Sequence, residues 1–76
     1  MIKIEDLLPL LRPGWVAMDE DKLWFWHQVK PDIQKINGMG MWGSKTYSGK
    51  IIRLKDLFDI APYDGDWSDS LMECGK

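Results

Sequence analysis

Histidine and cysteine are the side chains best suited to act as a base, a nucleophile or a metal ligand, and this chain of 76 residues has one of each. Nucleophilic catalysis needs a serine or cysteine beside a base, and the sequence assigns no such partner to His27. The single Cys74 excludes a disulfide within these residues, and two soft ligands are too few for structural zinc. We therefore expect no enzymatic activity, no cofactor and no metal, with His27 a partly buried structural residue.

Acidic and glycine-rich segments could in principle bind cations or phosphates. When Gly65 is aligned with the sixth position of an EF-hand loop, the calcium-ligand positions fall on Ile60, Pro62 and Leu71, which cannot serve. A turn capped by its own aspartates is the better interpretation of residues 64–69. The three glycines of residues 38–43 precede no expected helix, so they do not predict a phosphate cradle.

Tryptophan is the residue in excess, with five in the chain. Trp24 and Trp26 fall on one face of an expected strand, and Phe25 falls on the other. The rings either supply core area to a domain that is short of it, or they leave one face open for a partner, as tryptophan does at binding hot spots. We favour the core for most of the five. Trp42, which lies between glycines, is the least explained by packing.

Charge is unevenly distributed along the chain. Residues 27–55 carry six cations and one acid, whereas residues 56–76 carry one cation and six acids. We favour the interpretation that the basic and acidic segments face each other in the fold and neutralise each other, over the alternative of a basic docking patch. Basic residues such as Arg53 near Trp42 and Tyr47 partly match a nucleic-acid surface, but the isoelectric point of about 5.2 argues against binding to polyanions.

The first half of the chain predicts a helix followed by a β-hairpin. Apolar residues at positions 4, 7, 8 and 11 form one helical stripe, which Pro9 is expected to delay or kink. Residues 15–18 and 23–29 are expected strands joined by the polar turn 19–22, and Pro31 ends the second strand.

The second half gives weaker patterns. Within residues 32–50, Asn37-Gly38 indicates a turn, and the glycine-rich stretch 39–43 suggests a bulged edge strand or a mobile loop. We expect a strand at 50–54, one helical turn at 55–59, a turn cluster at 62–66, a final strand or turn at 68–72, and fraying over 73–76. The expected fold is a single α+β domain over residues 1–76, with a short N-terminal helix packed on a small antiparallel sheet of three to five strands.

No run of about 18 apolar residues is present, so no membrane span is expected. The first residues, Met1–Asp6, lack the basic and apolar regions of a signal peptide. Both observations favour a cytoplasmic protein.

Three segments carry a resemblance. They are Gly14–Asp21 (GWVAMDED), Leu23–Trp26 (LWFW) and Phe58–Met72 (FDIAPYDGDWSDSLM). Together they resemble small uncharacterised proteins encoded by phages and prophages of gut-type bacteria. The short helix, the tryptophan-bearing hairpin and the pair Asp66-Trp67 also show some similarity to the phage Thoeris-inhibitor family, which sequesters a cyclic nucleotide signal. Neither resemblance identifies a ligand-binding residue in this chain.

These observations lead to one functional hypothesis and two alternatives. The first is a phage or mobile-element accessory protein in the host cytoplasm that binds a host protein, such as a CRISPR-type defence nuclease, and inhibits or modulates it. Its binding residues would be Trp24, Trp26 and Trp42 as anchors, with Tyr47, Arg53, Asp64 and Asp66 beside them. The alternatives are a homo-oligomeric sponge for a cyclic nucleotide and a small nucleic-acid-binding module, although nucleic acid is the less expected partner.

Overall fold

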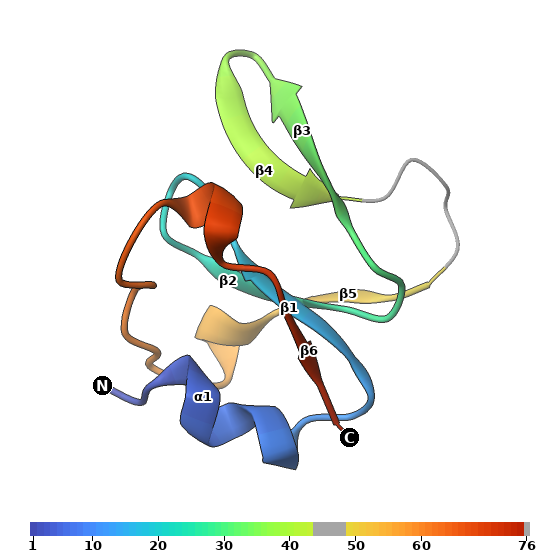
Figure 1. Ribbon diagram of the computed structural model, residues 1–76, viewed down its shortest axis with the longest axis vertical. Helices are drawn as coiled ribbons and strands as arrows, with labels where there is room; N and C mark the ends of the chain where they lie inside the picture. Colours follow the sequence, from blue (N-terminus) through green and yellow to red (C-terminus); the bar gives the residue numbers. More distant parts are fainter. Residues whose placement is uncertain (44–48, 76) are drawn as a thin grey trace.

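The computed structural model describes residues 1–43 and 49–75, and it shows a small α+β fold. A four-stranded antiparallel sheet has the order β5-β2-β1-β6, and a separate hairpin joins β3 to β4 (Figure 1). The strands are β1 (Gly14–Met18), β2 (Trp24–His27), β3 (Asp32–Ile36), β4 (Met39–Gly43), β5 (Ile51–Arg53) and β6 (Met72–Cys74). The expected fold class is confirmed.

The N-terminal helix is shorter than its apolar stripe suggests. The α-helix α1 (Ile4–Leu7) passes at once into the 3₁₀ helix η1 (Leu8–Leu10), in whose first turn Pro9 lies. Proline has no N–H to donate, so the α-helical bonding cannot continue through it. The stripe still directs Ile4 and Leu7 into the core.

The face of the sheet that carries Trp24 and Trp26 packs against α1 and forms the main core. In the register of β1 with β2, Val16 lies opposite Trp26 and Met18 lies opposite Trp24, so all four side chains share this face. The indole N–H of Trp24 donates to the Ala61 carbonyl at 3.0 Å. Of the two arrangements that the sequence allowed, the buried one is correct.

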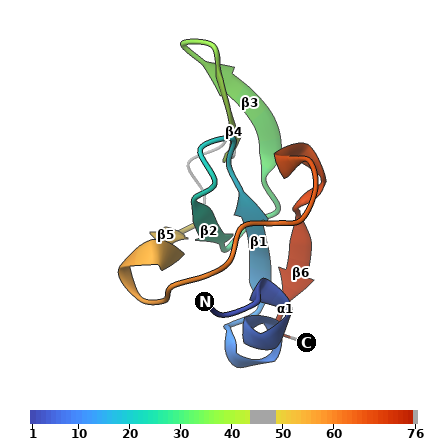
Figure 2. The ribbon, with the colours of Figure 1, turned by 90° about the vertical axis from the view of Figure 1, so that its left-hand side faces the viewer.

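The glycine-rich segment 39–43 is a regular strand. Asn37 and Gly38 have φ values of 54° and 81°, as both central residues of a type I′ hairpin turn require. The strand needs its glycine at position 40 because a Cβ there would overlap the ring of Trp67. Figure 2 shows the β3–β4 hairpin extending away from the four-stranded sheet.

The C-terminal residues are ordered by the sheet, so the expected fraying is wrong for residues 73–75. β6 pairs with β1, with Glu73 opposite Trp15 and Cys74 opposite Gly14. The Gly75 N–H then donates to the Leu8 carbonyl at 3.1 Å. The expected last strand at 68–72 lies later in the chain, because residues Trp67–Asp69 form the 3₁₀ helix η3 before β6 begins.

Within residues 1–43 and 49–75, no helix is long and apolar enough to cross a membrane.

Candidate functional site

The residues proposed from the sequence as binding residues do not form one site. Trp24, Trp26 and Trp42 are only 2%, 7% and 9% exposed, so their expected role as surface anchors is wrong. A domain of 76 residues has a small core, and these large rings supply much of its buried area. Tyr47 lies outside the described residues.

Trp42 belongs to a small second core beneath the β3–β4 hairpin. Its ring meets that of Trp67 edge to face, with centroids 6.3 Å apart and an interplanar angle of 82°. Its indole N–H donates to the Trp67 carbonyl at 3.3 Å. Packing with Trp67, which lies 25 residues later, therefore explains the ring that the sequence left unexplained.

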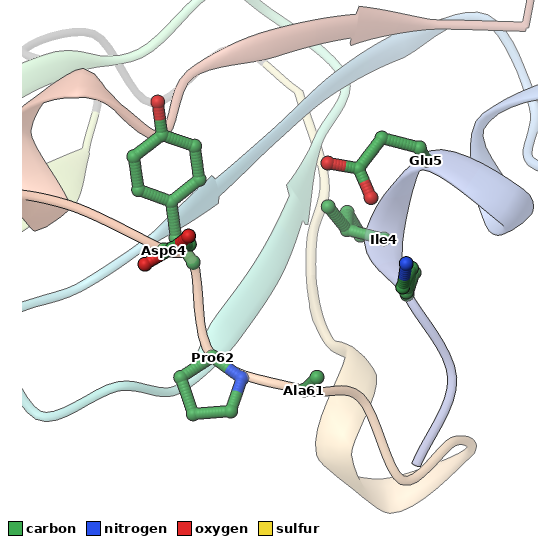
Figure 3. Close-up of a pocket in the computed structure, with 7 residues that line it drawn as sticks. Ile4, Glu5, Ala61, Pro62 and Asp64 are labelled. Atoms are coloured by element: carbon green, nitrogen blue, oxygen red, sulfur yellow. The ribbon is translucent and has the colours of Figure 1, made fainter.

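The two acidic residues proposed as binding residues, Asp64 and Asp66, have different roles in the structure. Asp66 caps η3, and its Oδ1 accepts from the Ser68 N–H at 3.1 Å. Asp64 lines a cleft of about 560 Å³ between α1 and the segment 61–64. In Figure 3 the carboxylates of Glu5 and Asp64 lie on opposite sides of this cleft. Both residues are exposed to solvent, so this cleft offers no preorganised site for a ligand.

A more distinctive surface lies between η1 and β5, where an apolar groove of about 310 Å³ opens. Trp26 and Leu54 line it and are buried, whereas Leu10, Leu57 and Ile52 are 77%, 65% and 42% exposed. Exposed apolar side chains around a concave surface are typical of an interaction site. The described residues that line it are Leu10, Leu11, Arg12, Trp26, Lys50, Ile52, Leu54, Leu57 and Phe58.

Three elements build this groove. Ile52 lies opposite Trp26 in the register of β5 with β2, which places both side chains on the same face of the sheet. The 3₁₀ helix η2 (Leu54–Asp56) then turns the chain, and the Leu57 and Phe58 N–H groups both donate to the Leu54 carbonyl at 2.9 Å. On the η1 side, the indole N–H of Trp26 donates to the Arg12 carbonyl at 3.1 Å.

The electrostatic character of the groove is basic. Among the described residues, its charged lining consists of Arg12 and Lys50, with no acidic side chain. Across the described ranges, neither cation forms a side-chain ion pair. Arg53 points to the other face of β5, where it pairs with Asp56 at 3.1 Å. Of the proposed binding residues that the structure describes, only Trp26 lines the groove.

The sequence contains an indication of this groove that the choice of expected binding residues overlooked. Leu10 falls outside the apolar stripe at positions 4, 7, 8 and 11, and Leu57 follows the charged pair Lys55-Asp56. Apolar residues away from a buried stripe are candidates for exposure. Periodicity cannot show that they lie on two sides of one groove.

Two buried titratable groups lie away from the groove. His27 is 2% exposed, and neither ring nitrogen has a hydrogen-bond partner among the described residues. Burial lowers the pKa of His27 to about 4. Asp19 is 6% exposed and accepts from the Trp42 N–H at 2.8 Å. Burial raises the pKa of Asp19 to about 6, against the opposing effect of that hydrogen bond. The burial of His27 agrees with the structural role that was expected for it.

No candidate metal-binding cluster of histidine, cysteine or acidic side chains is found in the described part of the chain. Comparison with family models, with curated proteins and with solved structures finds no match to this chain.

Proposed function

We propose that this protein acts by binding another protein, with the apolar groove as its docking site. The observation that supports this most directly is the exposure of Leu10, Ile52 and Leu57 around one concave surface. Full burial of such a side chain is worth about 1.5–3 kcal/mol. A partner that covers all three gains substantial free energy without any change in the fold.

The cations beside the groove indicate what the partner surface is like. Arg12 and Lys50 accompany the apolar side chains, and no acid lines the groove to neutralise them. Complementary charge around an apolar centre speeds the encounter and rejects wrong partners. We therefore propose a partner whose docking segment is apolar and acidic.

The biological role that we propose is that of a phage or mobile-element accessory protein that inhibits or modulates a host protein, such as a CRISPR-type defence nuclease. It is supported by the resemblance carried by Gly14–Asp21, Leu23–Trp26 and Phe58–Met72. A steric inhibitor needs only a surface that covers a functional part of its target. Such a mechanism suits a small domain with an exposed apolar groove and requires no chemistry of its own.

A small-molecule sponge is the second candidate, supported by the same groove. Its volume of about 310 Å³ lies at the lower end of the range for ligand pockets, which is roughly 300–1,000 Å³. Trp26 and Phe58 could contact a base, while Arg12 and Lys50 could pair with phosphate oxygens. A cyclic nucleotide has this combination of an aromatic base and a phosphate.

Affinity capture from bacterial lysate with matched variants tests the protein-binding proposal. We expect Leu57→Glu to abolish capture of a specific protein, because a carboxylate would have to be buried at the groove. Ile36→Glu is the control, since Ile36 is 49% exposed at the end of β3 and does not line the groove. Both variants should fold as the parent does. Retention of the captured protein by Leu57→Glu, or equal loss from both variants, would contradict the proposed site.

Calorimetric titration with a cyclic dinucleotide separates the two candidates. A sponge should release heat with the free protein, and Arg12→Ala should reduce the affinity. The mass from light scattering should then be that of an oligomer whose subunits share the ligand. The absence of binding at millimolar nucleotide would exclude this nucleotide as the ligand of the groove.

A further inference from the structure

The edge of the four-stranded sheet lies directly beside the apolar groove. β5 is the outermost strand in the order β5-β2-β1-β6, and Ile51, Ile52 and Arg53 are all exposed. The strand contains no proline, which is one of the devices that protect edges from pairing. Ile52 lines the groove, so a segment added along β5 would also reach the groove with alternate side chains.

The hydrogen-bonding phase of β5 shows which backbone groups face outward. The Gln28 N–H donates to the Lys50 carbonyl at 2.9 Å, so residue 50 bonds toward β2. Bonding alternates along an antiparallel strand, and Ile52 therefore also bonds toward β2. The N–H and C=O groups of Ile51 and the N–H of Arg53 point away from β2, toward the open side of the sheet. The Arg53 carbonyl belongs to the N-cap of η2 and already accepts the first bond of that helix. The outward groups present the donors and the acceptor that an added strand would use.

The opposite edge of the sheet is formed by β6. Just after β6, the chain turns toward η1, and the Gly75 N–H donates to the Leu8 carbonyl at 3.1 Å. No described residue of β6 lines the apolar groove, whereas Ile52 of β5 does.

Charge disfavours a second copy of this chain as the added strand. Lys50, Arg53 and Lys55 lie within six residues, against Asp56 alone. A two-fold pairing of β5 with itself would bring both sets of cations together, and like charges across a strand pair are destabilising. Arg53 is already paired with Asp56, but both side chains are more than half exposed, so a partner carboxylate could replace this weak ion pair.

We propose that β5 accepts an extended segment of the partner protein by antiparallel strand addition, and that this segment has the pattern acid, apolar, apolar, acid. This inference rests on the proposed function and specifies its binding mode. The two acids would lie opposite Arg53 and Lys50, and the two apolar residues opposite Ile52 and Ile51. The apolar residue opposite Ile52 would enter the groove, because opposed residues share a face. Main-chain bonds would supply affinity and the side chains specificity.

The test uses the ¹⁵N-labelled protein and the peptide acetyl-Thr-Glu-Val-Ile-Glu-Thr-amide. On binding, we expect hydrogen exchange of the Ile51 and Arg53 amides to slow by at least roughly tenfold. The Ile52 amide is the internal control, because it already bonds to β2 and should change little. A lysine-for-glutamate peptide should bind at least roughly tenfold more weakly, and Arg53→Glu should remove this preference, because each peptide would then have one favourable and one unfavourable charge pair.

Backbone methylation distinguishes strand addition from simple charge attraction. N-methylation of the first glutamate and of the isoleucine removes the two donors that would face β5, and it should abolish binding. N-methylation of the valine and the second glutamate leaves those donors intact, and binding should survive. Equal effects of the two methylated peptides, or binding that leaves the Ile51 and Arg53 amides unprotected, would overturn strand addition. So would failure of the glutamate peptide to bind at millimolar concentration.

The outcome for the groove itself is separate. A protein captured by the parent and lost with Leu57→Glu would support docking at the groove even if the peptide result overturned strand addition. If Leu57→Glu and Ile36→Glu both still captured the protein, and the peptide protected the Ile51 and Arg53 amides, the results would support binding at the β5 edge and contradict docking at the groove.

Discussion

Two buried ionisable residues make opposing contributions to stability, and we expect them to cancel. Burial raises the pKa of Asp19 from 3.8 to about 6, so the folded chain takes up this proton more readily than the unfolded chain. Its contribution to the free energy of unfolding is therefore largest below pH 3.8 and is lost as the pH rises through 6. Burial lowers the pKa of His27 from 6.5 to about 4, so its contribution is complete above pH 6.5 and is lost as the pH falls through 4.

The two magnitudes are similar. Each pKa changes by a little over two units, and each unit corresponds to about 1.4 kcal/mol, so each residue changes the free energy of unfolding by about 3 kcal/mol. The changes have opposite signs and nearly the same pH range. Together Asp19 and His27 should leave the free energy of unfolding of the parent protein almost independent of pH between 4 and 6.5.

Single substitutions should reveal each contribution. Asp19→Asn keeps an oxygen that can accept from the Trp42 N–H, so it removes the charge with little other change. Of the two residues, His27 alone then contributes, and the variant should lose about 3 kcal/mol of stability between pH 7 and pH 4. His27→Phe replaces a ring whose nitrogens have no partner among the described residues. Of the two residues, Asp19 alone then contributes, and this variant should gain about 2–3 kcal/mol over the same range.

Urea unfolding followed by tryptophan fluorescence at several pH values measures these slopes. The double variant is the control, and its free energy of unfolding should again be nearly flat. Slopes of the same sign in Asp19→Asn and His27→Phe would refute the assignment of opposite contributions. A flat profile in Asp19→Asn would show that His27 takes up its proton equally well in the folded and unfolded chain.

Two further pairs of substitutions, each a test with its control, probe the packing of the β3–β4 hairpin and of the turn at η3. Gly40→Ala should lower stability by about 1–3 kcal/mol, because the added methyl overlaps the Trp67 ring. Gly43→Ala, whose methyl meets only a flexible side chain, should cost less. The melting temperatures of the two variants measure this difference, and equal values would contradict the packing. Ser70→Ala should cost about 1–3 kcal/mol by leaving a buried backbone amide of β1 without its acceptor, as urea unfolding would show. Ser68→Ala, in the same turn, removes only the exposed hydrogen bond that the Ser68 hydroxyl donates to Asp66 Oδ1 at 3.0 Å. It should cost less than about 1 kcal/mol, and an equal cost would refute the burial argument.

The sequence by itself determined the features that depend on neighbouring residues. The β1–β2 hairpin follows from two apolar runs and an acidic turn, and the β3–β4 turn follows from Asn37-Gly38, which tolerate positive φ. Pro9 shortens the helix because it lacks a donor, whatever lies around it. These properties are set by backbone chemistry over a few residues.

The tertiary structure decided which of the apolar residues are buried. The sequence favoured the core for most of the tryptophans but could not say which ones. Trp24, Trp26 and Trp42 are buried because distant segments complete their surroundings. The carbonyl that accepts from the Trp24 indole, for example, belongs to Ala61, which lies 37 residues later. Fraying of 73–75 was expected because position near a chain end gives no information on pairing with β1.

The apolar groove has the same origin. Leu10 and Leu57 are 47 residues apart in the sequence, and neither belongs to an apolar pattern that identifies it as a contact residue. They line one groove because η1 and η2 pack on the same face of the sheet beside Ile52. Hydrophobicity is a property of each side chain, but its exposure depends on which other elements the fold places over it.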